Sequence, residues 1–189
     1  MGILSWYDSN DEKRILLLIA LSPVIKITAQ NETMYIGDVK YPVSNMATIY
    51  QSATVVQLTF VKMNDKNVMF VDARKSIKTI EDKDIIYYCT GMLKIHLDDE
   101  TIISCSDTKW YSFINDKGST GYFLTDNELK KMKNSNIKFI VYNMSCRFCP
   151  DSTAKTYSLD NVDYLTLSGS PQYTVPRADV SKIISDYFK

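Results

Sequence analysis

The sequence is poor in the residues on which most enzyme sites depend. It has one histidine, His96, among 189 residues. Ser-His-Asp triads need a histidine and most catalytic zinc sites use at least one, so any such site would have to include His96. The segment 93–97 alternates apolar and polar residues, which predicts a strand in which His96 is an ordinary strand-face side chain. Site chemistry that depends on histidine is therefore not expected.

The sequence also has few glycines and no net charge. The six glycines are too dispersed for a phosphate-binding loop or a G-x-G-x-x-G motif, and we expect no cofactor and no bound metal. Lysine plus arginine equals aspartate plus glutamate, 22 against 22, so no net field favours nucleic acid or an anionic membrane. Hydrophobic residues make up 45% and charged residues 23%, which are the values of a globular domain rather than a disordered chain.

The longest hydrophobic run is short and lies near the N-terminus. Residues 15–25 are uncharged, follow Lys13 and Arg14, and precede a polar stretch that ends with Ala29. This order is typical of a secretory signal, whereas a transmembrane helix needs about 20 apolar residues. We predict a signal-peptide-like segment over 1–29 and a single β-rich globular domain over 30–189. The domain is then periplasmic or secreted, with no stable membrane span after processing.

Acidic residues at the start of the chain favour a different interpretation of the same run. Asp8, Asp11 and Glu12 precede it, although signal peptides begin with positive charge. A buried N-terminal helix capped by Ser9 or Asn10 would place these acidic groups favourably in its first turn. In that alternative the protein is cytoplasmic.

Alternation of apolar and polar residues predicts strands over most of the remaining chain. Gly91 is predicted to form a bulge within its strand, because a glycine inside a strand pattern marks such a site. The polar clusters 64–67, 98–99 and 115–118 predict turns. The predicted strands cover 34–43 with a turn at 37–38, 54–63, 68–71, 85–97, 101–105, 110–114, 121–124, 137–141 and 162–167.

Two helices are predicted where the spacing of residues changes from every second residue to every third or fourth. Thr125 and Glu128 fit a capping box at the start of a short helix that ends near 134–136. At the C-terminus, Pro176 suits a first helical turn. An apolar stripe follows it, with Ile183 and Ile184 expected to be buried against a sheet. The predicted fold class is α+β, with mainly antiparallel sheet or sheets, a short middle helix and an amphipathic C-terminal helix.

The four cysteines hold the main hint of chemistry. Cys146 and Cys149 form a C-x-x-C, a spacing found in structural disulfides, in half of many zinc sites and in thiol-disulfide redox enzymes. Redox enzymes place this motif at the start of a helix, but loop residues follow it here. We interpret Cys146 and Cys149 first as a structural disulfide or as inert thiols. If 98–99 closes a hairpin, Cys89 and Cys105 are offset by about 10 Å along the strands. That offset is too large for a disulfide.

Aromatic residues are the second feature that points to function. The pairs Tyr87-Tyr88, Trp110-Tyr111 and Tyr122-Phe123 lie in predicted strands, and Tyr87, Trp110, Tyr111 and Tyr122 among them could form an aromatic binding face. We therefore predict an exported, non-catalytic domain that binds an unidentified protein, peptide or glycan through a sheet face or edge. The alternatives are a thiol-disulfide redox protein that uses Cys146 and Cys149, and a cytosolic structural or assembly protein.

Overall fold

The computed structural model describes most of the chain after residue 32. The described residues are 33–36, 38–51, 54–75, 85–114, 117–147, 154–165 and 174–189. All of them belong to one compact unit, Asn31–Lys189. The signal-like segment 1–29 lies outside the described residues, so export and the alternative of a buried helix both stay predictions.

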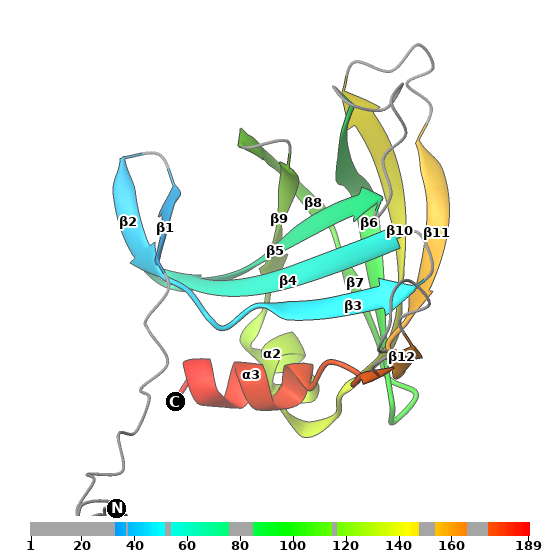
Figure 1. Cartoon of the computed structure of the whole chain (residues 1–189). Coiled ribbons are helices and arrows are strands. Elements are labelled where there is room, and N and C mark those ends of the chain that lie inside the picture. Colours follow the sequence, from blue (N-terminus) through cyan, green and yellow to red (C-terminus); the bar gives the residue numbers. More distant parts are fainter. Residues whose placement is uncertain are drawn as a thin grey trace, which may run out of the picture. The chain divides into compact units, whose positions relative to one another are not determined.

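The described residues of this unit form two larger antiparallel sheets, two two-stranded sheets and two short helices, which confirms the predicted fold class (Figure 1). One sheet contains, in spatial order, β3 (Ala47–Gln51), β4 (Thr54–Met63), β5 (Lys66–Lys75), β9 (Lys117–Leu124) and β8 (Asp107–Ile114). The other contains β11 (Lys155–Asp160), β10 (Ile137–Arg147), β6 (Ile86–Leu97) and β7 (Ile102–Cys105). Two small hairpins join β1 (Thr33–Ile36) to β2 (Val39–Pro42) and β12 (Tyr164–Leu165) to β13 (Thr174–Val175).

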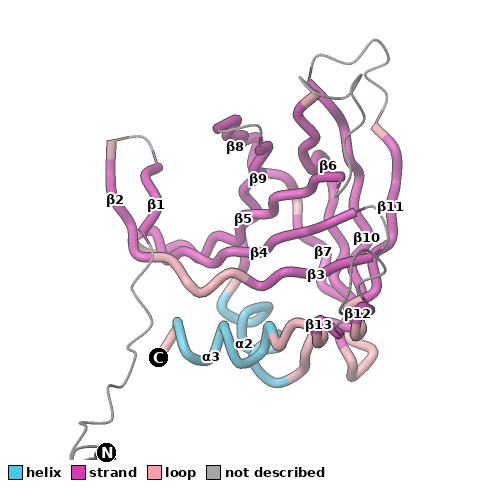
Figure 2. Tube along the Cα trace, viewed as in Figure 1, coloured by secondary structure: helices cyan, strands magenta, loops and turns pink. Residues whose placement is uncertain are grey.

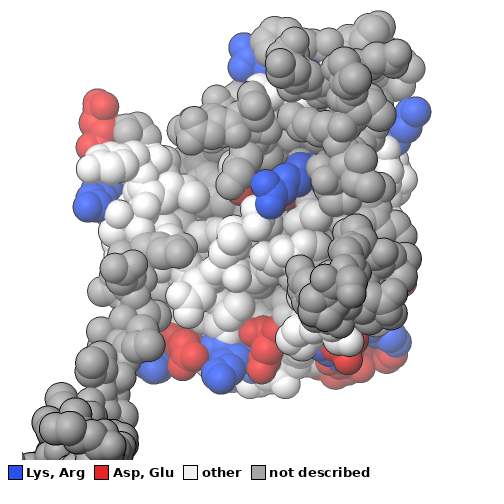
Figure 3. Space-filling model, in the orientation of Figure 1, with Lys and Arg blue, Asp and Glu red and all other residues white. Residues whose placement is uncertain are grey.

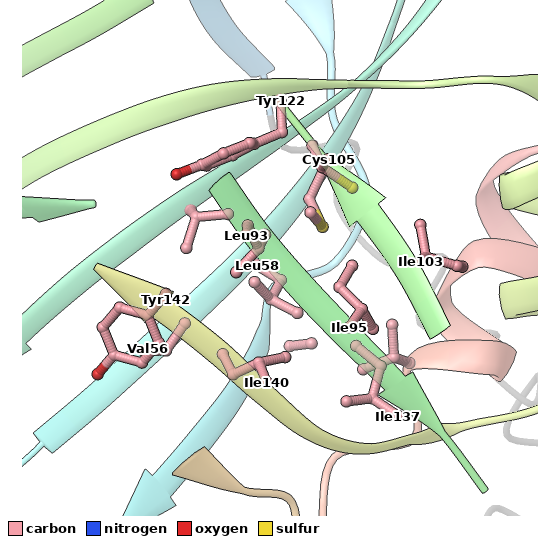
Figure 4. Close-up of a cluster of buried hydrophobic side chains, with 14 of the residues drawn as sticks. Val56, Leu58, Leu93, Ile95, Ile103, Cys105, Tyr122, Ile137, Ile140 and Tyr142 are labelled. Atoms are coloured by element: carbon pink, nitrogen blue, oxygen red, sulfur yellow. The ribbon is translucent and has the colours of Figure 1, made fainter. Parts of the chain in front are cut away.

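The hydrophobic core lies between the two sheets. Leu58 of β4, Leu93 of β6 and Ile140 of β10 each have 1% or less of their surface exposed, and their side chains meet in the middle of the core (Figure 4). Full burial of one such side chain stabilises the fold by about 1.5–3 kcal/mol. A second, smaller cluster covers the outer face of the five-stranded sheet, where the β1–β2 hairpin packs over Val68 and Phe70.

The sheets approach each other most closely where β9 crosses β6. A Cβ atom added to Gly118 would lie 2.3 Å from the carbonyl oxygen of Tyr87, so this position must be glycine. Two residues further on, the Thr120 hydroxyl donates a 2.6 Å hydrogen bond to the Cys89 carbonyl. Backbone of one sheet therefore contacts backbone of the other without a ladder of hydrogen bonds between them.

The predicted bulge at Gly91 is confirmed. Its φ is +67°, and the pairing of β10 with β6 shifts by two extra β6 residues between Lys94 and Thr90. The bulge is fixed by Asp107, whose side chain is 2% exposed and accepts a 3.1 Å hydrogen bond from the Gly91 amide. Asp107 also accepts a hydrogen bond from the hydroxyl of Tyr111. The carboxylate thus joins the bulge to the start of β8.

Helices α2 (Asp126–Asn134) and α3 (Val180–Tyr187) lie next to each other at one end of the sheets (Figure 2). The predicted capping box of Thr125 and Glu128 is present. The predicted helical turn at Pro176 is wrong, because α3 begins later with Asp179 as its N-cap. Of the two isoleucines expected to be buried, Ile184 is fully buried. Ile183 is only partly buried.

Candidate ligand-binding site

A shallow depression lies where the turn between β4 and β5 meets the junction between β9 and α2. Its volume is about 320 Å³, within the range of about 300–1,000 Å³ of ligand sites. The two walls are neighbours because Asn67, near the start of β5, pairs with Leu124 at the end of β9. The lining residues of this cleft are Asp65, Lys66, Asn67, Phe123, Leu124, Thr125 and Asp126.

Local chemistry holds both walls in place. Asn64 has a φ of +53° in the β4–β5 turn, a conformation that asparagine tolerates better than most residues. On the opposite wall the Thr125 hydroxyl accepts from the Glu128 amide at 3.2 Å, and the Glu128 carboxylate accepts from the Thr125 amide at 2.8 Å. The Asn67 side-chain amide donates a 2.8 Å hydrogen bond to Asp126, which ties the two walls together.

Phe123 belongs both to the cleft and to an exposed aromatic pair. Phe123 is 39% exposed and Trp110 is 40% exposed, values high for large aromatic side chains. Their ring centroids lie 5.2 Å apart with the planes at 75°, so the two rings form a corner. The ammonium of Lys66 lies 5.1 Å from the centre of the Phe123 ring, a cation–π contact at the rim of the cleft.

The aromatic face expected from the sequence does not form as one surface. Tyr122 is fully buried in the core, its hydroxyl has no hydrogen-bond partner among the described residues, and burial raises its pKa. Tyr87 packs against the core, and Tyr111 turns its hydroxyl towards Asp107. Neighbouring residues of a strand point to opposite faces, so the four predicted residues are divided between core and surface. Only Trp110 of these four is an exposed aromatic.

Phe123, the partner of Tyr122 in its predicted aromatic pair, is the residue that joins Trp110 at the surface. Its neighbour Tyr122 points inwards opposite Met69, so Phe123 points outwards opposite Val68. The polar lining residues Asp65, Asn67 and Asp126 carry a sequence signal only for a turn and a helix start. Their role in one cleft depends on the pairing of β5 with β9, which local sequence does not reveal.

The cysteines fall into two groups. Cys89 and Cys105 are free, buried thiols, which confirms the prediction that they are not bonded to each other. Cys105 lies opposite Leu93, four residues from Cys89. Burial raises the pKa of Cys89 strongly and that of Cys105 to about 12, so both thiols stay protonated at neutral pH. Cys146, near the end of β10, is disulfide-bonded, whereas Cys149 lies outside the described residues and its role stays a prediction.

Other polar and charged groups in the described part of the chain do not gather into a second site. No group of three or more histidine, cysteine, aspartate or glutamate residues there could hold a metal ion. His96 stacks on Phe139 with ring centroids 4.0 Å apart, which gives it a packing role on its strand face. Neither helix within these described residues is long and apolar enough to cross a membrane. On the face seen in Figure 3, acidic and basic side chains are intermingled.

No protein-family model, no curated protein and no solved structure matches this chain. The cleft and the aromatic pair are therefore interpreted from their own geometry.

Proposed function

We propose that this protein is an exported, non-catalytic domain that binds a protein, peptide or glycan at the cleft beside Phe123 and Trp110. The observation that carries the proposal is the exposed pair of aromatic rings next to the cleft, whose two walls are joined by a hydrogen bond. Exposed aromatic rings stabilise ligand contacts through large apolar area, and a few fixed polar groups orient the ligand. The two walls are joined by the hydrogen bond between Asn67 and Asp126, so the site is organised before the ligand binds.

Two features support export as part of the proposal. The segment 15–29 has the order of a secretory signal. Disulfides persist mainly in oxidising compartments, and Cys146 is disulfide-bonded. The two thiols that are free are buried, which protects them from oxidation in the same compartment.

The redox alternative has less support. A reactive cysteine needs a depressed pKa, which a helix N-terminus commonly supplies. Cys146 lies near the end of a strand, and the next described element along the chain is another strand, β11. The surroundings of Cys146 therefore give thiol exchange less support than the cleft gives to ligand binding.

Binding at the cleft can be tested while the ligand is still unidentified. The purified protein is screened against an array of glycans and against a phage-displayed peptide library. The Phe123→Ala variant is screened beside it, with Ile102→Ala as the control because Ile102 is an exposed apolar residue on the other sheet. We expect ligands whose binding is lost in Phe123→Ala and kept in Ile102→Ala. A protein that binds nothing, or that loses nothing in Phe123→Ala, contradicts the proposal.

A further inference from the structure

We infer that the ligand of the cleft is a neutral saccharide, an inference that rests on the proposed binding function. The first argument is the shape of the aromatic corner. A sugar ring has apolar faces made of C–H groups, which stack on aromatic rings. Trp110 and Phe123 present two rings at 75° to each other, each about two-fifths exposed. Such a corner can contact one face of a pyranose ring and its edge together.

The polar groups of the cleft match the hydroxyl rim of a sugar. Asp65 and Asp126 supply carboxylate oxygens as acceptors, and the buried Asn67 holds Asp126 in place through its side-chain amide. Sugar hydroxyls are donors that can each meet one of these acceptors. Hydrogen bonds to a charged acceptor are stronger than those between neutral groups, so the carboxylates are well suited to uncharged donors.

The charge of the cleft argues against acidic ligands. Two carboxylates, Asp65 and Asp126, face one ammonium, that of Lys66, which leaves a formal charge of −1. The ammonium of Lys66 is already placed over the Phe123 ring. A phosphate or a uronic acid would be repelled by the carboxylates. Neutral sugars meet no such penalty.

The position of the cleft within the sheet argues against an extended peptide. Peptides often bind by adding a strand to a free sheet edge. Phe123 lies on β9, which is paired on both sides, with β5 and with β8. Asn67 lies on β5, which is also paired on both sides. The two strands that line the cleft therefore have no open edge for a peptide to join, and the edge strand β8 carries Trp110 but none of the lining residues.

Trp110 provides a direct probe. The chain has two tryptophans, Trp6 and Trp110, so the Trp6→Phe variant leaves Trp110 as the single tryptophan, which is excited selectively over the tyrosines at the red edge of the absorption band. This variant is titrated into the millimolar range with neutral trisaccharides of glucose, mannose, xylose and N-acetylglucosamine, and with a trimer of glucuronic acid and trialanine for comparison. We expect at least one neutral trisaccharide to shift the emission of Trp110 to shorter wavelength in a saturable way, because stacking removes water from the exposed indole.

Variants of the cleft residues locate the binding. In the Trp6→Phe background, Phe123→Ala and Asp65→Asn should each lower the affinity for that trisaccharide by about tenfold or more. This is the effect of losing one aromatic or charge-assisted contact. Asp186→Asn removes the same charge from an exposed site on α3 and should leave the affinity unchanged. Asp65 lies in the β4–β5 turn, so its isosteric replacement gives a folded protein for comparison even if Phe123→Ala is unstable.

The outcomes separate the inference from the proposal on which it rests. If trialanine or the acidic trimer binds and Phe123→Ala abolishes that binding, the saccharide inference is wrong while the proposed function stands. If no compound in this set or in the wider screens binds, both fail. A neutral trisaccharide whose affinity is the same in Phe123→Ala and Asp65→Asn also overturns the inference, because its site lies elsewhere.

Discussion

At the scale of single residues, a few buried or capping carboxylates fix the geometry of this domain. Asp107 accepts hydrogen bonds from the Gly91 amide and the Tyr111 hydroxyl while almost fully buried. Asp179 caps α3 by accepting from the Lys182 amide at 3.0 Å. Such local bonds decide where a bulge lies and where a helix begins, which strand alternation alone does not determine.

The N-cap of α3 predicts a measurable pH dependence. Hydrogen bonds from the Lys182 amide and the Ser181 hydroxyl hold the pKa of Asp179 below its ordinary value of 3.8. A group with a lowered pKa stabilises the fold above that ordinary value, and the contribution is lost as the pH falls through the folded-state pKa. We expect Asp179→Ala to lose about 1 kcal/mol of unfolding free energy at neutral pH and much less near about pH 2.

Urea denaturation at both pH values measures this difference. Asp179→Asn is the matched control, because asparagine also caps helices but does not titrate. It should be close to the parent protein at neutral pH. An equal loss at both pH values in Asp179→Ala would show that the carboxylate charge is not the source of the stabilisation.

At the scale of helices and strands, the sequence predicted well what depends on local pattern. The capping box of Thr125 and Glu128 needs only a spacing of three residues, and strand β4 alternates apolar and polar residues over its middle part, 56–60. Prediction from the sequence failed where the position of a strand or side chain depends on pairing with strands far away in the chain. Strands β3 and β11 were not predicted, because each is a short strand at the end of a sheet and is too short for a long alternating pattern. The prediction of one aromatic face failed because the sheet must be known before its inward-pointing and outward-pointing residues can be distinguished.

The contact between β9 and β6 predicts a sharp difference between two glycines. Gly118→Ala would push a methyl group to within 2.3 Å of the Tyr87 carbonyl, so we expect a loss of about 3 kcal/mol or a failure to fold. Gly91→Ala meets only Asn143, at 3.5 Å, and should lose about 1–2 kcal/mol from its positive φ. Chemical denaturation of both variants measures the contrast. Equal stability of Gly118→Ala and the parent protein would mean that the two strands do not touch.

The C-terminal helix predicts an unequal effect of two neighbouring isoleucines. Ile184 is fully buried, so Ile184→Ala should lose about 3 kcal/mol of unfolding free energy. Ile183 is only partly buried against the core, and Ile183→Ala should lose about 1 kcal/mol. Guanidinium denaturation of the two single variants gives both values. A larger loss for Ile183→Ala would place the other face of α3 against the sheets.

At the scale of the whole molecule, two packed sheets provide a frame, and the residues proposed to bind a ligand lie on its surface. The core is filled by apolar side chains from both sheets. The cleft lies at the ends of strands β5 and β9, where the β4–β5 turn meets the capped start of α2. Loops and helix starts carried by a rigid sheet are common places for binding residues. The sequence identified the turn and the cap but could not show that they meet, because their contact depends on long-range strand pairing.

The cysteine pair predicts a separation between stability and binding. We expect Cys146→Ser with Cys149→Ser to lower the melting temperature modestly, since a disulfide that closes a short loop stabilises little. Binding at the cleft should be unchanged. The measurements are thermal melting and affinity for whichever probe the screens identify, beside the parent protein treated with reductant. A loss of binding in the double variant, with the fold intact, would favour the redox alternative.

The central claim is that ligands bind at the cleft between the β4–β5 turn and the start of α2, and amide chemical-shift mapping by NMR tests it most directly. The nitrogen-15-labelled protein is titrated with the best probe from the screens, and every resolved amide is followed. The account predicts that the largest shifts fall on residues 65–67 and 123–126 and on Trp110, and that they vanish in Phe123→Ala. Shifts concentrated on the four-stranded sheet instead, or unchanged in Phe123→Ala, would contradict it.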